Sequence, residues 1–332
     1  MIRSARWLAV AAFALVGCAV NGQTPAPPVP PSPPSPPAPE APAPAATPAP
    51  DSAATPVASP EQPAAGGSAP AVLIGAGDIA GCESDGDRLT AEILDTIPGT
   101  IFTTGDHAYP TGTFQQFRDC YDRAWGRHKA RTRPTPGNHD YMTAGARPYY
   151  NYFGDAAGQS GRGYYSYSLG PWHIIVLNSE ISARRGSPQE RWLRSELAAN
   201  TNRCVLAYWH RPLFSSVRME RRYRTEILPI WEALYEAGAD VVLNGHDHVY
   251  ERFARQNPDG EVDDARGIRQ FIVGTGGRSL YPFGDQPARN SEARTNETYG
   301  LLKLTLHDDR YDWEFITPLG AGFSDSGSTN CH

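Results

Sequence analysis

The sequence has little cysteine and carries no excess of positive charge. Its 332 residues include 30 Lys and Arg against 36 Asp and Glu, a formal net charge of −6, so its composition gives no support for binding to nucleic acid. Five residues are cysteines, and no two of them have the CxxC spacing, which argues against a zinc–thiolate site. A glycine-rich dinucleotide fingerprint and an internal repeat are also missing, which argues against a Rossmann unit.

The apolar run near the N-terminus is too short to span a bilayer comfortably. Residues 7–16 follow Arg3 and Arg6 and lead into LVGC, which ends at Cys18. This order is typical of a secretory signal, and its end resembles the lipobox of bacterial lipoproteins, in which the cysteine is lipidated. We therefore expect a lipoprotein signal over residues 1–18 and contact with the membrane only through a lipid on Cys18. An ordinary cleaved signal is the alternative.

The segment after the signal is too rich in proline to fold. Residues 25–70 hold 18 of the 31 prolines, interleaved with alanine and almost without aromatic residues. Such a segment cannot bury enough apolar surface to order itself, and its prolines favour extended polyproline II. We expect a disordered Pro/Ala-rich linker over residues 19–70, one folded domain over 71–320 and a short C-terminal tail over 321–332.

Four cysteines remain after Cys18. In an exported protein an even count favours disulfides over free thiols. Four cysteines allow three connectivities, and the pairing that we prefer joins Cys82 to Cys120 and Cys204 to Cys331.

The folded part alternates short apolar runs with amphipathic stretches. Residues 163–179 and 299–318 depart from this alternation and are predicted to form antiparallel hairpins. Strands linked by helices, together with hairpins, indicate an α/β sandwich. The predicted strands cover residues 72–76, 99–104, 205–209 and 241–244, and the predicted helices cover 87–97, 114–125, 188–200 and 223–237.

Polar side chains follow each predicted strand. In open α/β sheets, ligands gather where strands end and loops begin, so these side chains are expected to share one pocket. Each has an ordinary structural explanation when taken alone, but the same oxygen and nitrogen donors recur at successive strand ends. They are Asp78, Asp106, Tyr109, Asn138, His139, His210, His246 and His248.

The order of these groups resembles the calcineurin-like metallophosphoesterase superfamily and, within it, the purple acid phosphatases. The family blocks GDxG, GDxxY, GNH(D/E), VxxH and GHxH correspond here to GDIA, GDHAY, GNHD, AYWH and GHDH. The last block continues as VYER, as is common among purple acid phosphatases. Ala80 and Ala207 depart from the pattern, where purple acid phosphatases have glycine and valine, and neither of these side chains should bind a metal. The resemblance covers about residues 71–318 and implies a four-layer αββα sandwich, with two mixed β-sheets flanked by helices.

Ala80 stands where the broad superfamily has a histidine ligand. Purple acid phosphatases lack this histidine and use the tyrosine of GDxxY, here Tyr109. A phenolate is a hard anionic donor that suits trivalent iron. The alternative for Tyr109 is a packing residue before Pro110.

The resemblance implies a dinuclear centre in which Asp106 bridges both metals. His139 is expected to contact the substrate phosphate and to protonate the leaving oxygen. Asp140 either orients the His139 imidazole or makes a loop hydrogen bond. The first metal, Fe³⁺, would take Asp78, Asp106, Tyr109 and His248, and the second, Fe²⁺, Zn²⁺ or Mn²⁺, would take Asp106, Asn138, His210 and His246.

The implied reaction is hydrolysis of phosphate monoesters, of the acid phosphatase type, by a hydroxide that the two metals activate. The substrate would be a small phosphorylated molecule, and a phosphodiesterase or nucleotidase with the same site is the alternative. A binding protein without turnover is disfavoured because all seven expected ligands are present. The roles of two neighbouring residues are open. His107 faces either the pocket or, by preference, solvent. Arg211 either clamps phosphate or, by preference, forms a structural ion pair.

The expected location is the cell envelope, with the domain facing the periplasm or the exterior. Ala19 follows the lipobox cysteine and is not the aspartate that retains lipoproteins in an inner membrane. The resemblance therefore implies the outer membrane if the host has one.

Overall fold

The structure, a computed structural model, describes residues 69–217 and 221–332. The predicted signal over residues 1–18 and nearly all of the predicted linker over 19–70 lie outside these residues. Among the described residues, no helix has both the length and the apolar character needed to cross a bilayer.

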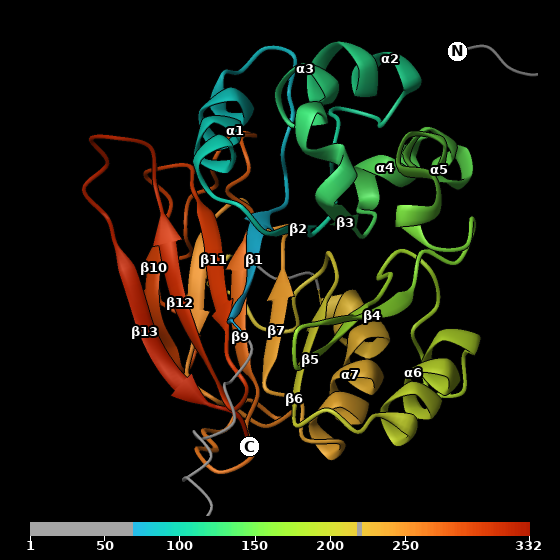
Figure 1. The fold of residues 1–332 in the computed structure, drawn as a ribbon, viewed down its shortest axis with the longest axis vertical. Helices are drawn as coiled ribbons and strands as arrows, with labels where there is room; N and C mark the ends of the chain where they lie inside the picture. Colours follow the sequence, from blue (N-terminus) through green and yellow to red (C-terminus); the bar gives the residue numbers. More distant parts are fainter. Residues whose placement is uncertain (1–68, 218–220) are drawn as a thin grey trace, which may run out of the picture. The chain divides into compact units, whose positions relative to one another are not determined.

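Two mixed β-sheets form the centre of the folded part (Figure 1). In the first sheet three strands are parallel to one another, and the C-terminal strands extend it with antiparallel pairing. Its spatial order is β13 (Asp325–Asn330), β12 (Arg310–Ile316), β11 (Leu301–Leu306), β1 (Ala71–Ala76), β2 (Thr100–Thr103) and β3 (Thr132–Pro134).

The second sheet has a parallel centre of four strands and antiparallel strands at its edges. Its spatial order is β10 (Ser291–Thr295), β8 (Tyr250–Phe253), β9 (Arg269–Val273), β7 (Val241–Asn244), β6 (Cys204–Tyr208), β5 (Trp172–Val176) and β4 (Tyr165–Leu169). The expected sandwich of two mixed sheets flanked by helices is therefore confirmed.

Alternation along β5 shows why the sheets pack as they do. Successive side chains of a strand point to opposite faces. Ile174 and Val176 lie in the core between the two sheets, whereas Ile175 packs with the helices α6 (Pro188–Ala199) and α7 (Arg221–Glu236). All five residues of β5 are buried, so the strand has two apolar faces, as expected of a central strand covered on both sides.

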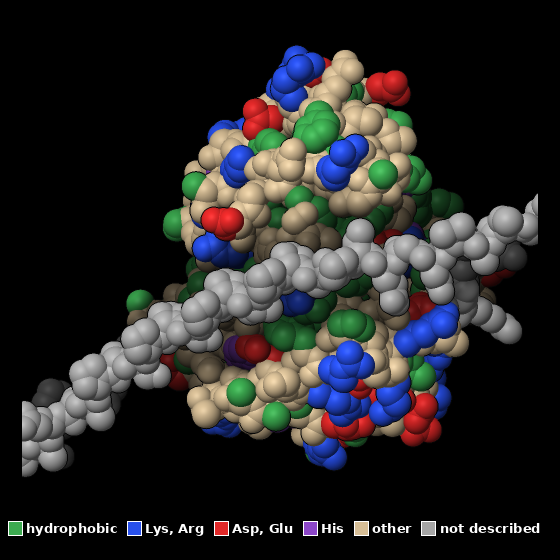
Figure 2. Space-filling model, turned by 90° about the vertical axis from the view of Figure 1, so that its right-hand side faces the viewer, with side chains coloured by type: hydrophobic (Ala, Val, Ile, Leu, Met, Phe, Trp, Pro, Cys, Tyr) green, Lys and Arg blue, Asp and Glu red, His purple; other side chains and the backbone are tan. Residues whose placement is uncertain are grey.

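Helices α6 and α7 cover one face of the second sheet (Figure 1). Ser187 begins α6, because its hydroxyl accepts from the backbone N–H of Glu190 at 3.1 Å and replaces a missing helical partner. Ion pairs such as Arg194–Glu236 and Arg184–Glu226 connect these helices with each other and with the preceding loop. Positive and negative side chains are accordingly mixed in the lower part of the face shown in Figure 2.

The remaining helical segments lie on the side of the first sheet, around β2 and β3 (Figure 1). The helix expected over residues 114–125 is broken by a π-helical turn at 117–121. The segments are α1 (Gly86–Thr96), α2 (Phe114–Gln116), α3 (Asp122–Ala124), α4 (Asn138–Met142) and α5 (Arg147–Phe153).

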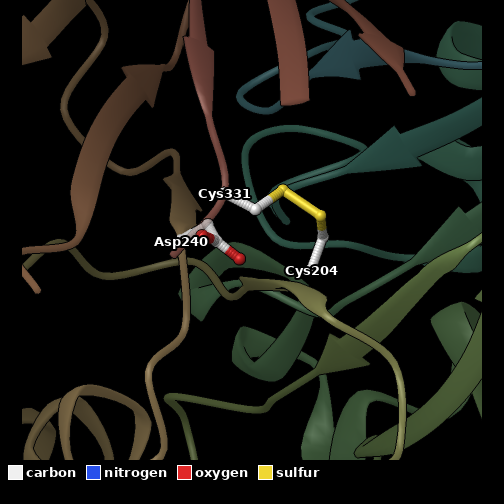
Figure 3. Close-up of side chains that lie close together, drawn as sticks. All are labelled: Cys204, Asp240 and Cys331. Atoms are coloured by element: carbon white, nitrogen blue, oxygen red, sulfur yellow. A yellow bond between two sulfur atoms is a disulfide. The ribbon is translucent and has the colours of Figure 1, made fainter. Parts of the chain in front are cut away.

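Both preferred disulfides are present. Cys82 is bonded to Cys120, and Cys204 to Cys331. Figure 3 shows the second bond beside Asp240, whose carboxylate accepts from the backbone N–H groups of Val205 and His332. These three side chains lie close enough together to hold an ion, but the two sulfur atoms are bonded to each other, so they form no thiolate site.

The prediction of a C-terminal tail over residues 321–332 was wrong. Residues 325–330 form β13, which pairs with β12 over its whole length, and Cys331 is bonded to Cys204 at the start of β6. The polar, small residues of this strand give no apolar signal in the sequence. Its partner strand and its disulfide place it in the domain.

Candidate dinuclear metal centre

The candidate site lies where five parallel strands end. Asp78 follows β1, Asp106 follows β2, Asn138 follows β3, His210 follows β6, and His246 and His248 follow β7. The carboxyl ends of neighbouring parallel strands meet along one edge of a sheet. Two sheets packed face to face therefore bring these loops together.

Three of these residues have left-handed backbone angles. The φ values are 58° at Asp78, 54° at Asp106 and 71° at His246, a region that costs energy for residues other than glycine. The loops hold one another there: the Asp78 N–H donates to the Gly105 carbonyl at 3.0 Å, and the His246 N–H donates to Asp78 Oδ2 at 2.8 Å. Such strain turns the side chains of three loops toward one point.

Four donor atoms form a first set around Tyr109. Its hydroxyl lies 3.0 Å from Asp78 Oδ1, 3.1 Å from Asp106 Oδ2 and 3.0 Å from His248 Nε2. His248 Nε2 also lies 3.3 Å from Asp78 Oδ1. The four side chains expected at the first metal thus converge on one small volume.

A second set of four donor atoms is centred on His210 Nε2. Its Nε2 lies 3.0 Å from Asn138 Oδ1, 3.2 Å from His246 Nδ1 and 3.3 Å from Asp106 Oδ2. These are the four side chains expected at the second metal. Because Asp106 Oδ2 belongs to both sets, the two groups share one carboxylate oxygen.

Gly137 permits the loop after β3 to approach Asp106 closely. A Cβ atom at Gly137 would lie 2.2 Å from Asp106 Oδ1, far inside van der Waals contact. The same carboxylate oxygen accepts from the backbone N–H of His139 at 2.7 Å. The glycine before Asn138 therefore lets the loop after β3 close over Asp106.

The donor sets fit cations because oxygen and nitrogen atoms that can bind a metal converge in each of them. His210 Nδ1 lies 2.7 Å from the Thr104 carbonyl, and His248 Nδ1 lies 2.5 Å from the Ser279 carbonyl. Each Nδ1 can therefore donate its proton to a carbonyl, which leaves Nε2 as the ring nitrogen that would bind a cation. Oxygen and nitrogen donors arranged in this way suit divalent and trivalent ions.

Burial and fixed charge shape the acid–base behaviour of the site. Burial disfavours the charged form of His210, but the Asp106 carboxylate outweighs it and raises the pKa of His210 to about 10. Burial, followed by the charges of Asp106 and Asp78, raises the pKa of Tyr109 well above its usual value. Burial and then His210 hold the pKa of His246 well below its usual value. The metal-free site thus keeps Tyr109 protonated, and a cation would have to displace that proton.

Asp140 makes loop hydrogen bonds, the second of its two expected interpretations. It is fully buried, accepts from the backbone N–H of Gly137 at 2.9 Å and of Asp106 at 3.0 Å, and lies 3.0 Å from His107 Nδ1. The imidazole of His139 contacts the Pro110 carbonyl instead, at 2.5 Å from Nδ1. Asp140 therefore ties two ligand-bearing loops together and does not contact the ring of His139.

The preference for a solvent-facing His107 was wrong. Its side chain is fully buried, its Nε2 lies 2.7 Å from the Thr103 hydroxyl, and its ring packs against Phe153 with centroids 4.8 Å apart. A polar side chain beside Asp106 is expected at the surface, but Asp140 and Thr103 supply both hydrogen bonds of His107 inside the core.

A cavity of about 260 Å³ opens beside the donor sets. Asp106, Asn138, His139, Arg211 and Tyr281 are among the residues that line it. This volume accommodates a phosphate group with a small substituent. The donor atoms of both sets therefore border a space that a small ester can enter.

Two residues near the donor sets were missed in the sequence, one in the wall of the cavity and one behind Arg211. Tyr281 stacks on His248 with ring centroids 3.9 Å apart, and Glu180 forms a two-point ion pair with Arg211. Glu180 follows the end of β5, so the rule that marks polar residues after a strand applies to it as well. Tyr281 lies in a long loop and gives no such signal.

Comparison with known proteins agrees with this geometry. Purple acid phosphatase 15 of Arabidopsis thaliana is 31% identical over 147 residues, which cover 42% of this chain and 27% of the plant protein. Acid phosphatase type 7 of Homo sapiens is 29% identical over 208 residues, which cover 52% of this chain and 46% of the human protein. This chain thus spans less than half the length of either relative.

Solved structures share the fold. The purple acid phosphatase PPD1 from yellow lupin (Lupinus luteus) seeds aligns with a TM-score of 0.66 at 18% identity, over 79% of this chain and 54% of that one. GAP50, described as the anchor in the inner membrane complex of Plasmodium, aligns with a TM-score of 0.61 at 15% identity, over 80% and 90% of the two chains.

A family model described as calcineurin-like phosphoesterase matches residues 72–250. That stretch includes all seven side chains of the two donor sets. The matched segment and the shared sandwich show that this chain belongs to the calcineurin-like phosphoesterase family, an enzyme family that implies a dinuclear metal centre here.

Proposed function

We propose that this protein is a phosphomonoesterase of the purple acid phosphatase type, acting on small phosphate esters at a dinuclear metal centre outside the cytoplasm. The observation that carries the proposal is the single carboxylate oxygen, Asp106 Oδ2, that two four-atom donor sets share. One of these sets contains the hydroxyl of Tyr109. The names of the plant and human relatives support the acid phosphatase assignment.

The donor sets differ in a way that suits two different ions. The set around Tyr109 offers a phenol and two carboxylates with one imidazole, which favours Fe³⁺. The set around His210 offers two imidazoles, an amide and the shared carboxylate, which favours a divalent ion, Fe²⁺, Zn²⁺ or Mn²⁺. A bound pair of cations would lower the pKa of a water molecule and neutralise charge on the phosphoryl oxygens.

The chain's own residues would position the substrate and move one proton. His139 lines the cavity, its ring lies on Tyr109 with centroids 4.4 Å apart, and its Nδ1 is occupied by the Pro110 carbonyl. The other ring nitrogen, Nε2, lies 3.9 Å from Asp106 Oδ2. We assign Nε2 of His139 the transfer of a proton to the leaving oxygen.

The test of the proposed reaction uses the mature protein loaded with iron and zinc. We expect it to hydrolyse p-nitrophenyl phosphate faster than bis(p-nitrophenyl) phosphate. Asp106→Asn and His210→Ala should each abolish turnover, with far-UV circular dichroism unchanged. His173→Asn is the matched control, since His173 is buried on β5 and contacts Glu196, away from both donor sets.

Two results would contradict this proposal. Turnover that persists in Asp106→Asn would place the chemistry elsewhere in the molecule. A faster reaction with the bis ester would favour the alternative, a phosphodiesterase with the same donor sets.

The proposed location rests on different residues. The two disulfides support an oxidising compartment, and the lipobox-like end at Cys18 supports a lipid anchor in the cell envelope, in the outer membrane if the host has one. Cells that express the full chain should incorporate labelled palmitate into it, and Cys18→Ser should remove the label. A label that persists in the variant would refute the anchor.

A further inference from the structure

Arg211 is a buried cation in the wall of the cavity. Arg211 is 6% exposed and follows His210 directly in the chain. The guanidinium binds Glu180 through two parallel contacts, Nε to Oε1 at 2.8 Å and Nη2 to Oε2 at 3.0 Å. A fork of this kind fixes the plane of the guanidinium as well as its position.

The fork with Glu180 uses only one edge of the guanidinium. The other nitrogen, Nη1, faces the metal centre and lies 3.2 Å from His246 Nε2. The ring of Tyr223 lies against the guanidinium, with 3.7 Å between Cζ and the ring centroid. Arg211 therefore presents Nη1 to the cavity in a fixed direction, held by a carboxylate on one side and an aromatic ring on another.

The contact between Arg211 Nη1 and His246 Nε2 depends on which nitrogen of His246 carries the proton. His246 Nδ1 belongs to the second donor set, 3.2 Å from His210 Nε2, so Nδ1 is the nitrogen that would bind a cation. A neutral imidazole then carries its proton on Nε2. Arg211 can only donate. In the metal-loaded protein, two N–H groups therefore meet at this corner of the cavity and neither can accept from the other.

We propose that Arg211 Nη1 and His246 Nε2 form an oxyanion-binding corner that takes one non-bridging oxygen of the substrate phosphate, with Glu180 as the residue that positions Arg211. This inference rests on the proposed function and adds to it the groups that would select a monoester over a diester. A monoester phosphate has three non-bridging oxygens and a diester has two. Two oxygens can be neutralised by two cations, one each, and a third exists only in the monoester.

The corner therefore favours a terminal phosphate over a diester. In a diester the third position carries a second substituent, which cannot accept hydrogen bonds as an anionic oxygen does. Glu180 neutralises the formal charge of Arg211, so the contribution comes from directed hydrogen bonds to an anionic oxygen and not from net charge. Lysine cannot replace it, because an ammonium cannot hold the fork with Glu180 and reach the cavity at the same time.

The experiment compares Arg211→Lys, Arg211→Ala and Glu180→Gln with the wild type, all in the metal-loaded full chain. Calorimetry measures the affinity for inorganic phosphate, and kinetics measure kcat/KM for p-nitrophenyl phosphate and its bis ester. Loss of a charge-assisted hydrogen bond should weaken phosphate binding and monoester kcat/KM in Arg211→Lys by about 10- to 100-fold. The diester kcat/KM should change by less than about 3-fold, because the diester has no third anionic oxygen for Arg211 to bind.

Glu180→Gln separates positioning from direct contact. Glutamine keeps only one acceptor for the fork, so we expect the same pattern with a smaller loss, expressed in KM more than in kcat. Added methylguanidinium should restore phosphate binding to Arg211→Ala. Arg194→Lys is the matched control, because Arg194 also pairs with glutamate side chains, those of Glu190 and Glu236, but lies outside the cavity.

The outcomes are distinguishable. Wild-type phosphate affinity in Arg211→Lys would overturn the corner, and equal losses for both esters would overturn its selection of monoesters. If the wild type hydrolyses neither ester, the proposed function fails, while the binding data still decide whether Arg211 holds phosphate. If Arg211→Lys fails to fold, Glu180→Gln must show the monoester-selective loss, and its absence would overturn the proposal.

Discussion

The hydroxyl of Tyr109 lies 3.0 Å from Nε2 of His248, a residue 139 positions further along the chain. Both side chains also face the carboxylate of Asp78. Ala80, two residues after Asp78, is buried and bridges to Ala108 through the backbone. The methyl group of Ala80 thus leaves the donor position to Tyr109, which reaches it from the next loop.

Tyr109→Phe should remove the phenol oxygen and keep the aromatic ring. If Fe³⁺ binds there, the wild type has a visible absorption band from phenolate to iron, and the variant should lose it. We expect the variant to retain less iron after dialysis, because a phenyl ring offers no oxygen. Elemental analysis together with a visible spectrum measures both changes.

Tyr281→Phe is the control for that spectrum. Tyr281 stacks on His248 at 3.9 Å between centroids but belongs to neither donor set, so its variant should keep the band. A band that survives in Tyr109→Phe and disappears in Tyr281→Phe would show that Tyr281, and not Tyr109, supplies the phenolate.

His139→Ala should affect esters according to their leaving groups. An alkoxide needs a proton to depart, whereas p-nitrophenolate leaves readily without one. We therefore expect kcat to fall about 10²- to 10⁴-fold for an alkyl phosphate, the usual range for general acid catalysis, and far less for p-nitrophenyl phosphate. His128→Ala, outside the cavity, should change neither rate, and equal losses for both esters would argue against proton transfer by His139.

The sequence predicted the candidate site better than its surroundings. Polar side chains that follow strands, such as Asp106 and His210, could be grouped because parallel strands end at a common edge, and the structure brings all seven expected donors together. Their roles as ligands stay predictions until metal is bound. The strands β1, β2, β6 and β7 and both hairpins were also found from apolar runs and turns.

The misses have a common physical origin in contacts between distant residues. His107 is buried because Asp140, 33 residues away, accepts its hydrogen bond, and nothing near His107 in the chain indicates this partner. Strand β13 is held by β12 and by the bond between Cys204 and Cys331. Neither its polar composition nor its position near the end of the chain predicts a strand.

Removing the disulfide between Cys204 and Cys331 should lower stability and leave catalysis intact. The bond closes a loop with a sequence separation of 127 residues, and loss of a native disulfide costs about 2–5 kcal/mol. Cys204 begins β6, whereas His210 follows the other end of that strand. We expect the double alanine variant to unfold at lower urea concentration with unchanged kcat, and an unchanged midpoint would show that strand pairing alone holds β13.

The effect of pH on stability should be visible at Asp87, which lies outside the candidate site. Asp87 is buried in the first turn of α1, and its burial raises the pKa from 3.8 to about 6. Because the folded-state pKa is above the unfolded value, the contribution of Asp87 to stability is complete below about pH 3.8 and is lost as the pH rises through about 6. Asp87→Asn stays neutral throughout. The difference in Tm between Asp87→Asn and the wild type should therefore increase from pH 4.5 to 7.5, by roughly 2–4 °C for each kcal/mol.

Asp155→Asn provides the comparison for this pH series. Asp155 also lies in the first turn of a helical segment but is exposed, so its charge remains solvated in the folded protein. The same substitution there should leave the difference in Tm constant between the two pH values. If Asp87→Asn raises the Tm equally at pH 4.5 and 7.5, the gain comes from packing or helix propensity. Burial of the ionised Asp87 carboxylate would then not destabilise the protein.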